Sequence, residues 1–468
     1  MRIVQLASGT DRPSQVSLAT KVHVLALLLC IVSLSGPASS LPAQIPTSTY
    51  DARHTAVLSK LGPDVMLVPA RGSFLFDDQM GFMQAPDFQY LTGMSEQIGA
   101  VLLLDGSDRS ATLYVPRPSP LISLGIIPPT RAAADSLRIN NVVPIDSLEP
   151  QLRRRFAMAR TVAHVSATDA RGAVSTPLPM ASSGVRWRNW VTTLGAAEAK
   201  PALPMLRGMR EIKSAEEIAI LRRVGAQSGA AMLAGMRALR DGQTQRKAEL
   251  AVVNACETAG ARSVSFWPWT MSGPNARFEN LFSSFQSYEH IDRVMRAGEV
   301  VRVDVGCQSD HYMGDVGRTA PVSGRFTAGQ REAWDLFIAG YRAGMLLIKD
   351  GAAAKDILAA ALAEIRRRAP TLTAPQGKHA AETLLSAGGT APWQLHGVGL
   401  DDAEGQPEIL RTGMTVAYEL MFVVDGDGFY LEDMIAVGAT GPDLLTPGLP
   451  YTADEIERAM ITGSRTKR

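Results

Sequence analysis

The sequence predicts an α+β protein of two domains that follow an export signal. Short apolar runs bounded by glycine, aspartate and proline predict strands mixed with helices over residues 48–204. Beyond that region two helices are followed by strand-rich segments, and the same order then occurs again. This repetition is typical of a pseudo-repeated sheet with helices packed on one side. A length of 468 residues allows two or three domains with buried cores.

Composition and charge exclude several classes of protein. Lys plus Arg is 47 and Asp plus Glu is 46, a net charge of +1, so we expect no nucleic-acid partner, which would need a basic face. A hydrophobic content of 46% with 20% charged residues is globular and excludes a disordered or fibrous chain. Three cysteines are too few for a disulfide scaffold.

The first 43 residues are predicted to be a signal peptide. An apolar run over 22–35 follows Lys21, and small residues lead to a cleavage site near Ala43. We therefore expect an exported protein, periplasmic or secreted. An uncleaved anchor is the alternative, but the run is short for a membrane span, and no later stretch is long enough for one. The mature chain keeps Cys256 and Cys307, which either pair in an oxidising compartment or stay as free buried thiols.

The N-terminal domain is predicted over residues 48–204. Its expected strands are 65–68, 100–104 and 111–115. A proline-rich stretch over 116–120 follows the last of them, and the domain boundary falls near 203–210.

The second domain is predicted over residues 205–450, and 451–468 are expected to be a C-terminal tail. Capping boxes at Ser214–Glu217 and Thr327–Gln330 each begin a helix. The four expected helices are 214–239, 244–259, 327–349 and 355–368. The expected strand-rich segments are 264–270, 300–319, 391–400 and 414–440.

Two predicted hairpins each place a pair of carboxylates face to face. A reversal at Ser309-Asp310 would set Asp304 opposite Asp315. The dipeptide Asp425-Gly426 is a strong hairpin signal, and a reversal there sets Glu419 opposite Glu432. A second possible reversal at 427–428 would break that pairing. A single acidic hairpin is usually a solvated turn, so the argument rests on the repeated construction.

Four buried carboxylates need compensation by cations. Like charges opposite one another in a sheet are destabilising, and an unpaired buried carboxylate costs several kcal/mol or takes up a proton. Four carboxylates balance about two divalent ions. His396, flanked by glycines, is the expected nitrogen ligand, although a lone histidine beside glycine is more often a packed or exposed loop residue. Oxygen ligands with one imidazole suit Mn, Zn, Co or Fe.

This ordered set of residues resembles the pita-bread metallopeptidases, the group that contains aminopeptidase P, prolidase and methionine aminopeptidase. The resemblance is carried by residues 304–319, by His396-Gly397-Val398-Gly399-Leu400-Asp401, by Glu432-Asp433 and by the loop at 272–276. Residues 87–100 resemble the N-terminal domain of aminopeptidase P. The resemblance covers nearly all of the mature chain.

The resemblance implies a pita-bread catalytic domain, a smaller α/β N-terminal domain and a particular chemistry. Asp315 and Glu432 would bridge two divalent metal ions, usually Mn, while Asp304 completes one site and His396 with Glu419 completes the other. A hydroxide shared by the ions would cleave a peptide substrate between its N-terminal residue and proline. Relatives often self-associate, so a homo-oligomer is expected by analogy.

Five departures from the family pattern surround these ligands. Asn280 and Ala403 stand where the family has two auxiliary histidines, and losing such donors lowers rates by on the order of 10²-fold each. Gly317 replaces a threonine, Tyr430 replaces an arginine, and Leu420-Met421 replaces Pro-Gly. Asn280 keeps one donor group and is the only side chain beyond the ligands that we expect to assist catalysis. The histidines with potential to replace the missing pair are His290, His311 and His379.

These departures leave three functions open. The first is an Xaa-Pro aminopeptidase. The second is a dinuclear metallohydrolase with a different, non-proline peptide or amide substrate. The third is a catalytically weakened member of the family or a non-catalytic binding protein. No nucleophile elbow, HExxH helix or phosphate-binding loop supports another chemistry, and Cys307 is more readily explained as a packed strand residue than as a nucleophile.

Overall fold

A computed structural model describes residues 45–72, 83–95, 97–117, 137, 139–166, 183–277, 280, 292–386 and 393–461. The predicted signal peptide and His290 lie outside the described residues. Within these ranges, none of the helices combines the length and the apolar character needed to cross a membrane. The α+β prediction is confirmed by the sheets and helices that follow.

The N-terminal domain is built on a mixed six-stranded sheet with the order β4-β3-β2-β1-β5-β6. Its strands are β1 Val65–Pro69, β2 Val101–Asp105, β3 Ser110–Val115, β4 Asn141–Pro144, β5 Val162–Val165 and β6 Glu198–Pro201. Its helices are α2 Thr47–Leu61, α3 Pro86–Thr92, η2 Ile145–Ser147, α5 Leu148–Met158, α6 Ser183–Thr193 and the connecting α7 Leu203–Arg210. Alternate residues of β1 face two different cores, because successive side chains of a strand point to opposite faces.

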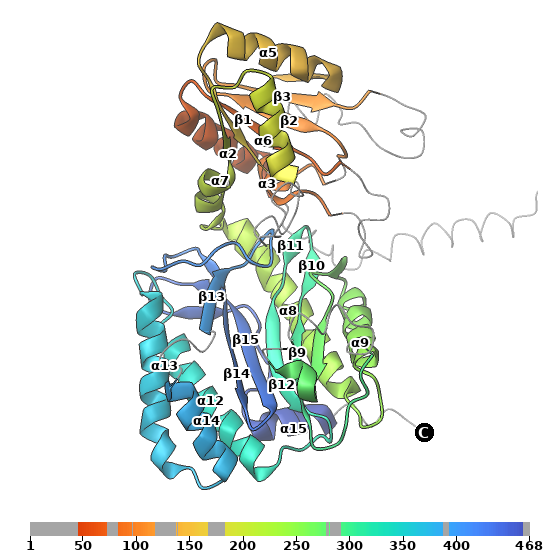
Figure 1. Cartoon of the computed structure of the whole chain (residues 1–468), viewed down its shortest axis with the longest axis vertical. Helices are drawn as coiled ribbons and strands as arrows, with labels where there is room; N and C mark the ends of the chain where they lie inside the picture. The colour runs from red at the N-terminus through yellow and green to blue at the C-terminus, as the bar shows by residue number, and fades with distance from the viewer. Residues whose placement is uncertain are drawn as a thin grey trace, which may run out of the picture. The chain divides into compact units, whose positions relative to one another are not determined.

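The C-terminal domain contains a seven-stranded sheet, β13-β14-β15-β12-β9-β8, with β16 paired to β15. These strands are β8 Trp269–Ser272, β9 Val300–Val305, β12 Val316–Pro321, β13 Trp393–Gly397, β14 Thr415–Val424, β15 Asp427–Val437 and β16 Pro442–Leu444. A smaller sheet pairs β7 Ser263–Val264, β10 Cys307–Ser309 and β11 Tyr312–Met313. Figure 1 shows β14, β15, β12 and β9 side by side in the large sheet.

The helices of this domain pack against the large sheet. They are α8 Ala215–Ala238, α9 Gln245–Thr258, α12 Ala328–Met345, α13 Ala354–Arg368, α14 Pro375–Ser386 and α15 Ala453–Ile461, with short 3₁₀ turns η4 Gly273–Ala276 and η6 Ala369–Thr371. Both predicted capping boxes are present, at Ser214 and at Thr327. The tail prediction is wrong for α15, because Ile456 and Met460 are buried in the main core. Helix α14 was not predicted at all.

The register of the first acidic hairpin differs from the prediction by two residues. The chain turns at Asp310-His311, where both φ angles are positive, and Asp304 pairs with Gly317 rather than with Asp315. Asp315 precedes β12 in the link from β11. A shift of two residues preserves the face to which a side chain points, so Asp304 and Asp315 still share one side of the sheet.

The second acidic hairpin has the predicted register. Glu419 pairs with Glu432 across β14 and β15, which turn at Asp425-Gly426. Both turn residues have positive φ angles, as a two-residue hairpin turn of this type requires.

A disulfide bond joins Cys256, at the end of α9, to Cys307, at the start of β10. This resolves the two alternatives for these cysteines in favour of the pair. The bond fixes the small sheet to α9 three residues after Asp304, and both cysteines are fully buried.

Candidate metal centre

The five predicted ligands come from five neighbouring segments of the large sheet. The first two are Asp304 on β9 and Asp315 just before β12, and the remaining three are His396 on β13, Glu419 on β14 and Glu432 on β15. Glu432 is fully buried, and Asp304, Asp315 and His396 are nearly so. Because adjacent strands present these side chains from one face, residues separated by more than one hundred positions meet at one point.

His396 marks the centre of the cluster. Its Nε2 atom lies 3.6 Å from Glu432 Oε1, 3.7 Å from Glu419 Oε1 and 4.0 Å from Asp315 Oδ2. One ligand atom each from Asp315, His396 and Glu432 lie within 4.8 Å of one another. Ligand atoms about 2 Å from a common metal ion lie at most about 4 Å apart, so the three separations from His396 Nε2 fit a metal site.

The electrostatics of the cluster favour either bound protons or a cation. Burial raises the pKa values of Asp304 and Asp315 well above their usual range and also raises the pKa of Glu419. The charge of Glu432 raises each of the three further. Burial lowers the pKa of His396, but the close approach of the Glu432 carboxylate and the charges of both glutamates outweigh burial and raise that pKa to about 9. The site therefore retains protons that a metal ion would displace.

Two buried carboxylate oxygens in the cluster have no hydrogen-bond partner. They are Asp304 Oδ1 and Glu432 Oε1. A buried unsatisfied acceptor costs on the order of 1–3 kcal/mol, and more if charged, so such atoms are normally ligands or hydrogen-bonded. The oxygen-rich donor set with one imidazole fits Mn, Zn, Co or Fe.

Two departures from the family pattern, Tyr430 and Gly317, form one structural unit. The Tyr430 hydroxyl lies 2.8 Å from Glu419 Oε2 and 2.7 Å from Glu432 Oε2, so it is placed to donate to either carboxylate. A Cβ atom on Gly317 would lie only 2.0 Å from Tyr430 Cε1. The glycine thus leaves the space that the tyrosine ring fills.

Arg302 is a buried residue of the site that the sequence reasoning missed. Its Nη2 atom lies 3.3 Å from Asp304 Oδ2, and its guanidinium carbon lies 4.1 Å from the centre of the Tyr430 ring. Nη1 lies 2.7 Å from Met421 Sδ. The feature of the sequence that could have identified Arg302 is its position as the one arginine in the valine-rich segment Val300–Val305, all of which is buried.

Asn280 and the candidate replacement histidines His311 and His379 make contacts away from the metal-ligand cluster. The Asn280 amide donates to the Pro274 carbonyl at 2.8 Å. His379 pairs with Asp425 at the tip of the β14–β15 hairpin, about 20 Å along the strand from Glu419. His311 lies in the turn between β10 and β11. Neither histidine belongs to the metal-ligand cluster found among the described residues.

Glu404 holds the loop that follows His396. Its carboxylate accepts hydrogen bonds from Lys213 Nζ at 2.7 Å and from the backbone N–H of Leu400 at 2.9 Å, and it also pairs with Arg210. Burial raises the pKa of Glu404, but the two cations outweigh burial and lower the pKa to about 2. Gly399 packs directly on this carboxylate, where a Cβ would lie 2.6 Å from Glu404 Oε2. Gly397 and Gly399 therefore leave the space that Glu404 fills.

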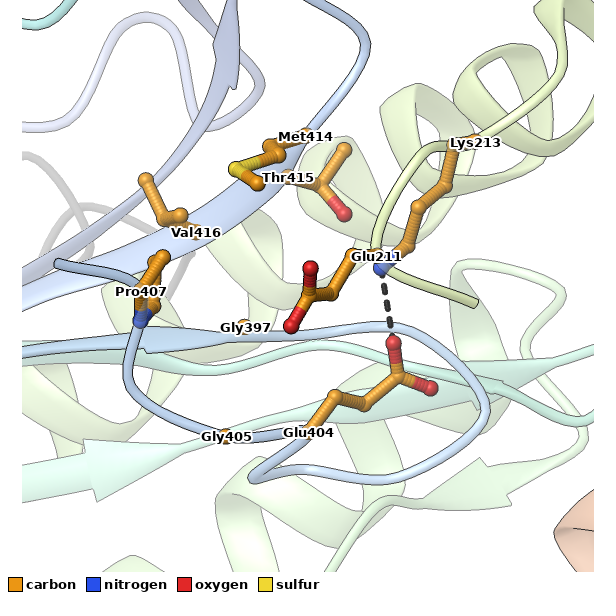
Figure 2. A pocket seen from close by; sticks show the side chains of 9 residues that line it. All are labelled: Glu211, Lys213, Gly397, Glu404, Gly405, Pro407, Met414, Thr415 and Val416. Carbon is orange, nitrogen blue, oxygen red and sulfur yellow. Dashed lines mark hydrogen bonds and ion pairs between the residues drawn. The ribbon is translucent and has the colours of Figure 1, made fainter. Parts of the chain in front are cut away.

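A small pocket lies beside this ion pair, as Figure 2 shows. Its lining residues are Glu211, Lys213, Gly397, Glu404, Gly405, Pro407, Met414, Thr415 and Val416. The dashed line in Figure 2 marks the bond between Lys213 and Glu404, which both line the pocket.

Comparisons with known proteins find similar sequences and folds. Residues 219–439 match metallopeptidase family M24, and residues 50–164 match the aminopeptidase P N-terminal domain. A protein named Xaa-Pro aminopeptidase in Escherichia coli is 25% identical over 452 residues, which cover 90% of this chain and all of the relative. Xaa-Pro aminopeptidase 2 of Streptomyces coelicolor is 32% identical over 191 residues, 36% of this chain and 41% of the relative.

Solved structures show the same fold. A variant of Escherichia coli aminopeptidase P superposes with a TM-score of 0.72 at 23% identity, covering 91% of this chain and 100% of that chain. Proline aminopeptidase P II from Yersinia pestis gives 0.71 at 24% identity, covering 89% and 100%. The predicted fold, a pita-bread domain preceded by a smaller α/β domain, is confirmed by these matches.

Proposed function

Because residues 219–439 belong to metallopeptidase family M24 and residues 50–164 form an aminopeptidase P N-terminal domain, we propose that this protein is a metal-dependent Xaa-Pro aminopeptidase. It would release an N-terminal residue that precedes proline. The observation that carries the proposal is the convergence of Asp315, His396 and Glu432 within 4.8 Å, with buried carboxylate oxygens left without partners. The Xaa-Pro substrate is taken from relatives such as the Escherichia coli protein.

The five ligands would hold two divalent ions, with Mn as the first candidate. Asp315 and Glu432 would be shared, Asp304 would complete one site, and His396 with Glu419 would complete the other. Bound divalent ions supply Lewis acidity and lower the pKa of water to near neutral. The protein's own contribution is to exclude bulk water by burial, to orient Glu419 and Glu432 through the Tyr430 hydroxyl, and to hold the His396 loop through Glu404.

A second candidate function is hydrolysis of a different peptide or amide. It is favoured by Asn280 and Ala403, where the family places histidines. The Asn280 amide donates a hydrogen bond to the Pro274 carbonyl in the structure, and Ala403 has no side-chain donor. A weakened or non-catalytic binding protein is the third possibility that these positions support.

One experiment separates these functions. The mature chain is loaded with Mn and given matched tripeptides with proline, alanine or glycine at the second position, with Glu432→Gln as the inactive control. The proposal expects hydrolysis of the proline peptide only, lost in the control. Turnover of the other peptides alone would favour the second candidate, and bound metal without any turnover would favour the third.

We further propose that the protein is exported to the periplasm or secreted. The signal-like segment at residues 1–43 and the buried Cys256–Cys307 bond support this, because structural disulfides persist in oxidising compartments. Fractionation of cells that express the full chain tests it. Recovery of the uncleaved chain from the cytosol would contradict it.

A further inference from the structure

We propose that the N-terminal domain positions the metal ligands through two buried hydrogen-bonded networks, in which Asp87 and Arg53 are positioning residues. The first network joins Asp87 to the loop that follows His396, and the second joins Arg53 to the strand that precedes Asp315. The inference rests on the proposed metal-dependent function and names residues outside the ligand set that control its geometry.

The first network begins on helix α3 and ends on the loop after His396. Asp87 of α3 accepts a hydrogen bond from Arg210 Nη1 at 2.9 Å, and Arg210 Nε donates to Glu404 Oε1 at 3.1 Å. The same Glu404 oxygen accepts from the backbone N–H of Leu400, four residues after His396. Asp87, Arg210 and Glu404 are all buried. One guanidinium therefore links a carboxylate of the N-terminal domain to the loop that follows a metal ligand.

Charge balance gives Asp87 its part in the first network. Asp87 and Glu404 carry two negative charges, and Arg210 and Lys213 carry two positive charges. Without the charge of Asp87 both cations would depend on Glu404 alone, and a buried cation that loses its partner is strongly unfavourable. The Glu404 carboxylate would then shift toward Arg210 and loosen its hold on the Leu400 N–H.

The second network begins on helix α2 and ends on strand β11. Nη2 of Arg53 lies 3.0 Å from Glu217 Oε1, and the Tyr312 hydroxyl donates to that same oxygen at 2.7 Å. Tyr90 holds Arg53 in place, because its carbonyl accepts from Nη1 at 2.7 Å and its ring centre lies 3.9 Å from the guanidinium carbon. Tyr312 lies on β11, three residues before Asp315. A cation of the N-terminal domain thus reaches the strand that leads to a second metal ligand.

The two networks meet beside the metal ligands. The backbone N–H of Met313, on β11, donates to the Gly399 carbonyl in the loop after His396 at 2.7 Å. Val398 and Leu400 of this loop pack in the same apolar core as residues of α2 and α3. Groups that hold ligand-bearing segments in this way set the orientation of the ligands and hence the affinity for the metal.

The test compares single substitutions in the intact, oxidised mature chain, at a temperature where each variant is folded by circular dichroism. Asp87→Asn and Arg53→Met each remove one charge from a network. Asp105→Asn and Arg155→Met are the matched controls, because these two residues form a mostly buried ion pair with each other inside the N-terminal domain.

The expected result separates positioning from stability. Asp87→Asn and Arg53→Met should each lower Mn(II) affinity on the order of 10-fold in equilibrium dialysis, because groups that orient metal ligands typically contribute about 10- to 100-fold. Excess Mn should restore turnover by mass action. In the ion-free protein, amide hydrogen exchange should accelerate over 397–405 in Asp87→Asn and over 312–316 in Arg53→Met. The controls should lose stability with no change in Mn affinity.

Each outcome decides the matter. Unchanged Mn affinity in the two folded network variants would overturn the inference, and so would an equal loss of affinity in the controls. If a network variant fails to fold, Tyr312→Phe takes its place with Tyr114→Phe as control, because each loses only a hydrogen-bonded hydroxyl. A wild type that binds no Mn would remove the proposed function, while hydrogen exchange in the ion-free protein would still decide whether the networks position these segments.

Discussion

The contact between Gly317 and Tyr430 gives a prediction whose size follows from the structure. In Gly317→Ala the new Cβ would lie 2.0 Å from Tyr430 Cε1 and 2.4 Å from Cδ1. Carbon atoms in contact are normally about 3.5–4.0 Å apart, so the ring has to move by about 1.5 Å. Both residues are buried inside the sheet, and overpacking of this kind costs about 1–3 kcal/mol.

Displacement of the ring also reaches the metal ligands. The Tyr430 hydroxyl is 2.8 Å from Glu419 and 2.7 Å from Glu432, so a shift of about 1.5 Å breaks these hydrogen bonds. A hydrogen bond to a charged group contributes about 1.5–3 kcal/mol. We therefore expect Gly317→Ala to lower the free energy of unfolding by about 3 kcal/mol and to weaken Mn binding.

The assay is urea unfolding of the ion-free and Mn-loaded proteins, arranged as a double-mutant cycle. Tyr430→Ala removes the ring, so Gly317→Ala should be nearly neutral in that background and the coupling energy should be at least ~1 kcal/mol. Gly208→Ala is the matched control, because Gly208 is exposed in helix α7 and a Cβ added there would have no atom within 4 Å. It should stabilise the protein by up to about 1 kcal/mol.

The reasoning is refuted if Gly317→Ala unfolds within about 0.5 kcal/mol of the wild type, since surface substitutions away from special features have effects of that size. Equal costs with and without the Tyr430 ring would show that a different contact fills the space.

Three further predictions concern the site and its supports. Glu432→Gln should abolish tight Mn uptake, and retention of a full equivalent in dialysis would exclude Glu432 as a ligand. The increase in melting temperature produced by Mn should grow as pH rises from 6.5 to 9. His396 has a folded pKa of about 9, above its unfolded value, so its charged form stabilises the ion-free fold below pH 6.5 and this contribution is lost as pH rises. A pH-independent increase in melting temperature would contradict this. Replacing Cys256 and Cys307 by serine opens a loop with a sequence separation of 51 residues and should cost about 4 kcal/mol in the chain-entropy account, measured by urea unfolding against the oxidised wild type.

The sequence was sufficient to predict both acidic hairpins, but it gave the correct strand register for only the second of them. The dipeptide Asp425-Gly426 determines a two-residue turn, so the pairing of Glu419 with Glu432 could be counted directly. The first acidic hairpin turns at Asp310-His311, and a histidine at positive φ is not a common turn signal. The pairing error was two residues, which is why the side chains still meet on the correct face.

The surroundings of the ligands were less accessible to sequence reasoning. Tyr430 and Gly317 were identified as separate departures, because their contact joins β15 to β12 and depends on tertiary structure. Arg302 lies in a valine-rich strand and gave no motif, and its role appears only when the Tyr430 ring and Met421 lie beside it. Helix α15 was missed because its burial depends on a distant core.

The bond between Cys256 and Cys307 also determines how this protein has to be prepared for metal analysis. In a host whose cytoplasm keeps thiols reduced, the same two positions would present adjacent sulfur atoms a few residues from Asp304. Thiolates are soft ligands with a strong preference for Zn and Cu(I). A reduced preparation could then gain an adventitious ion that the oxidised molecule has no means of holding, and its metal content would describe the expression host rather than the enzyme.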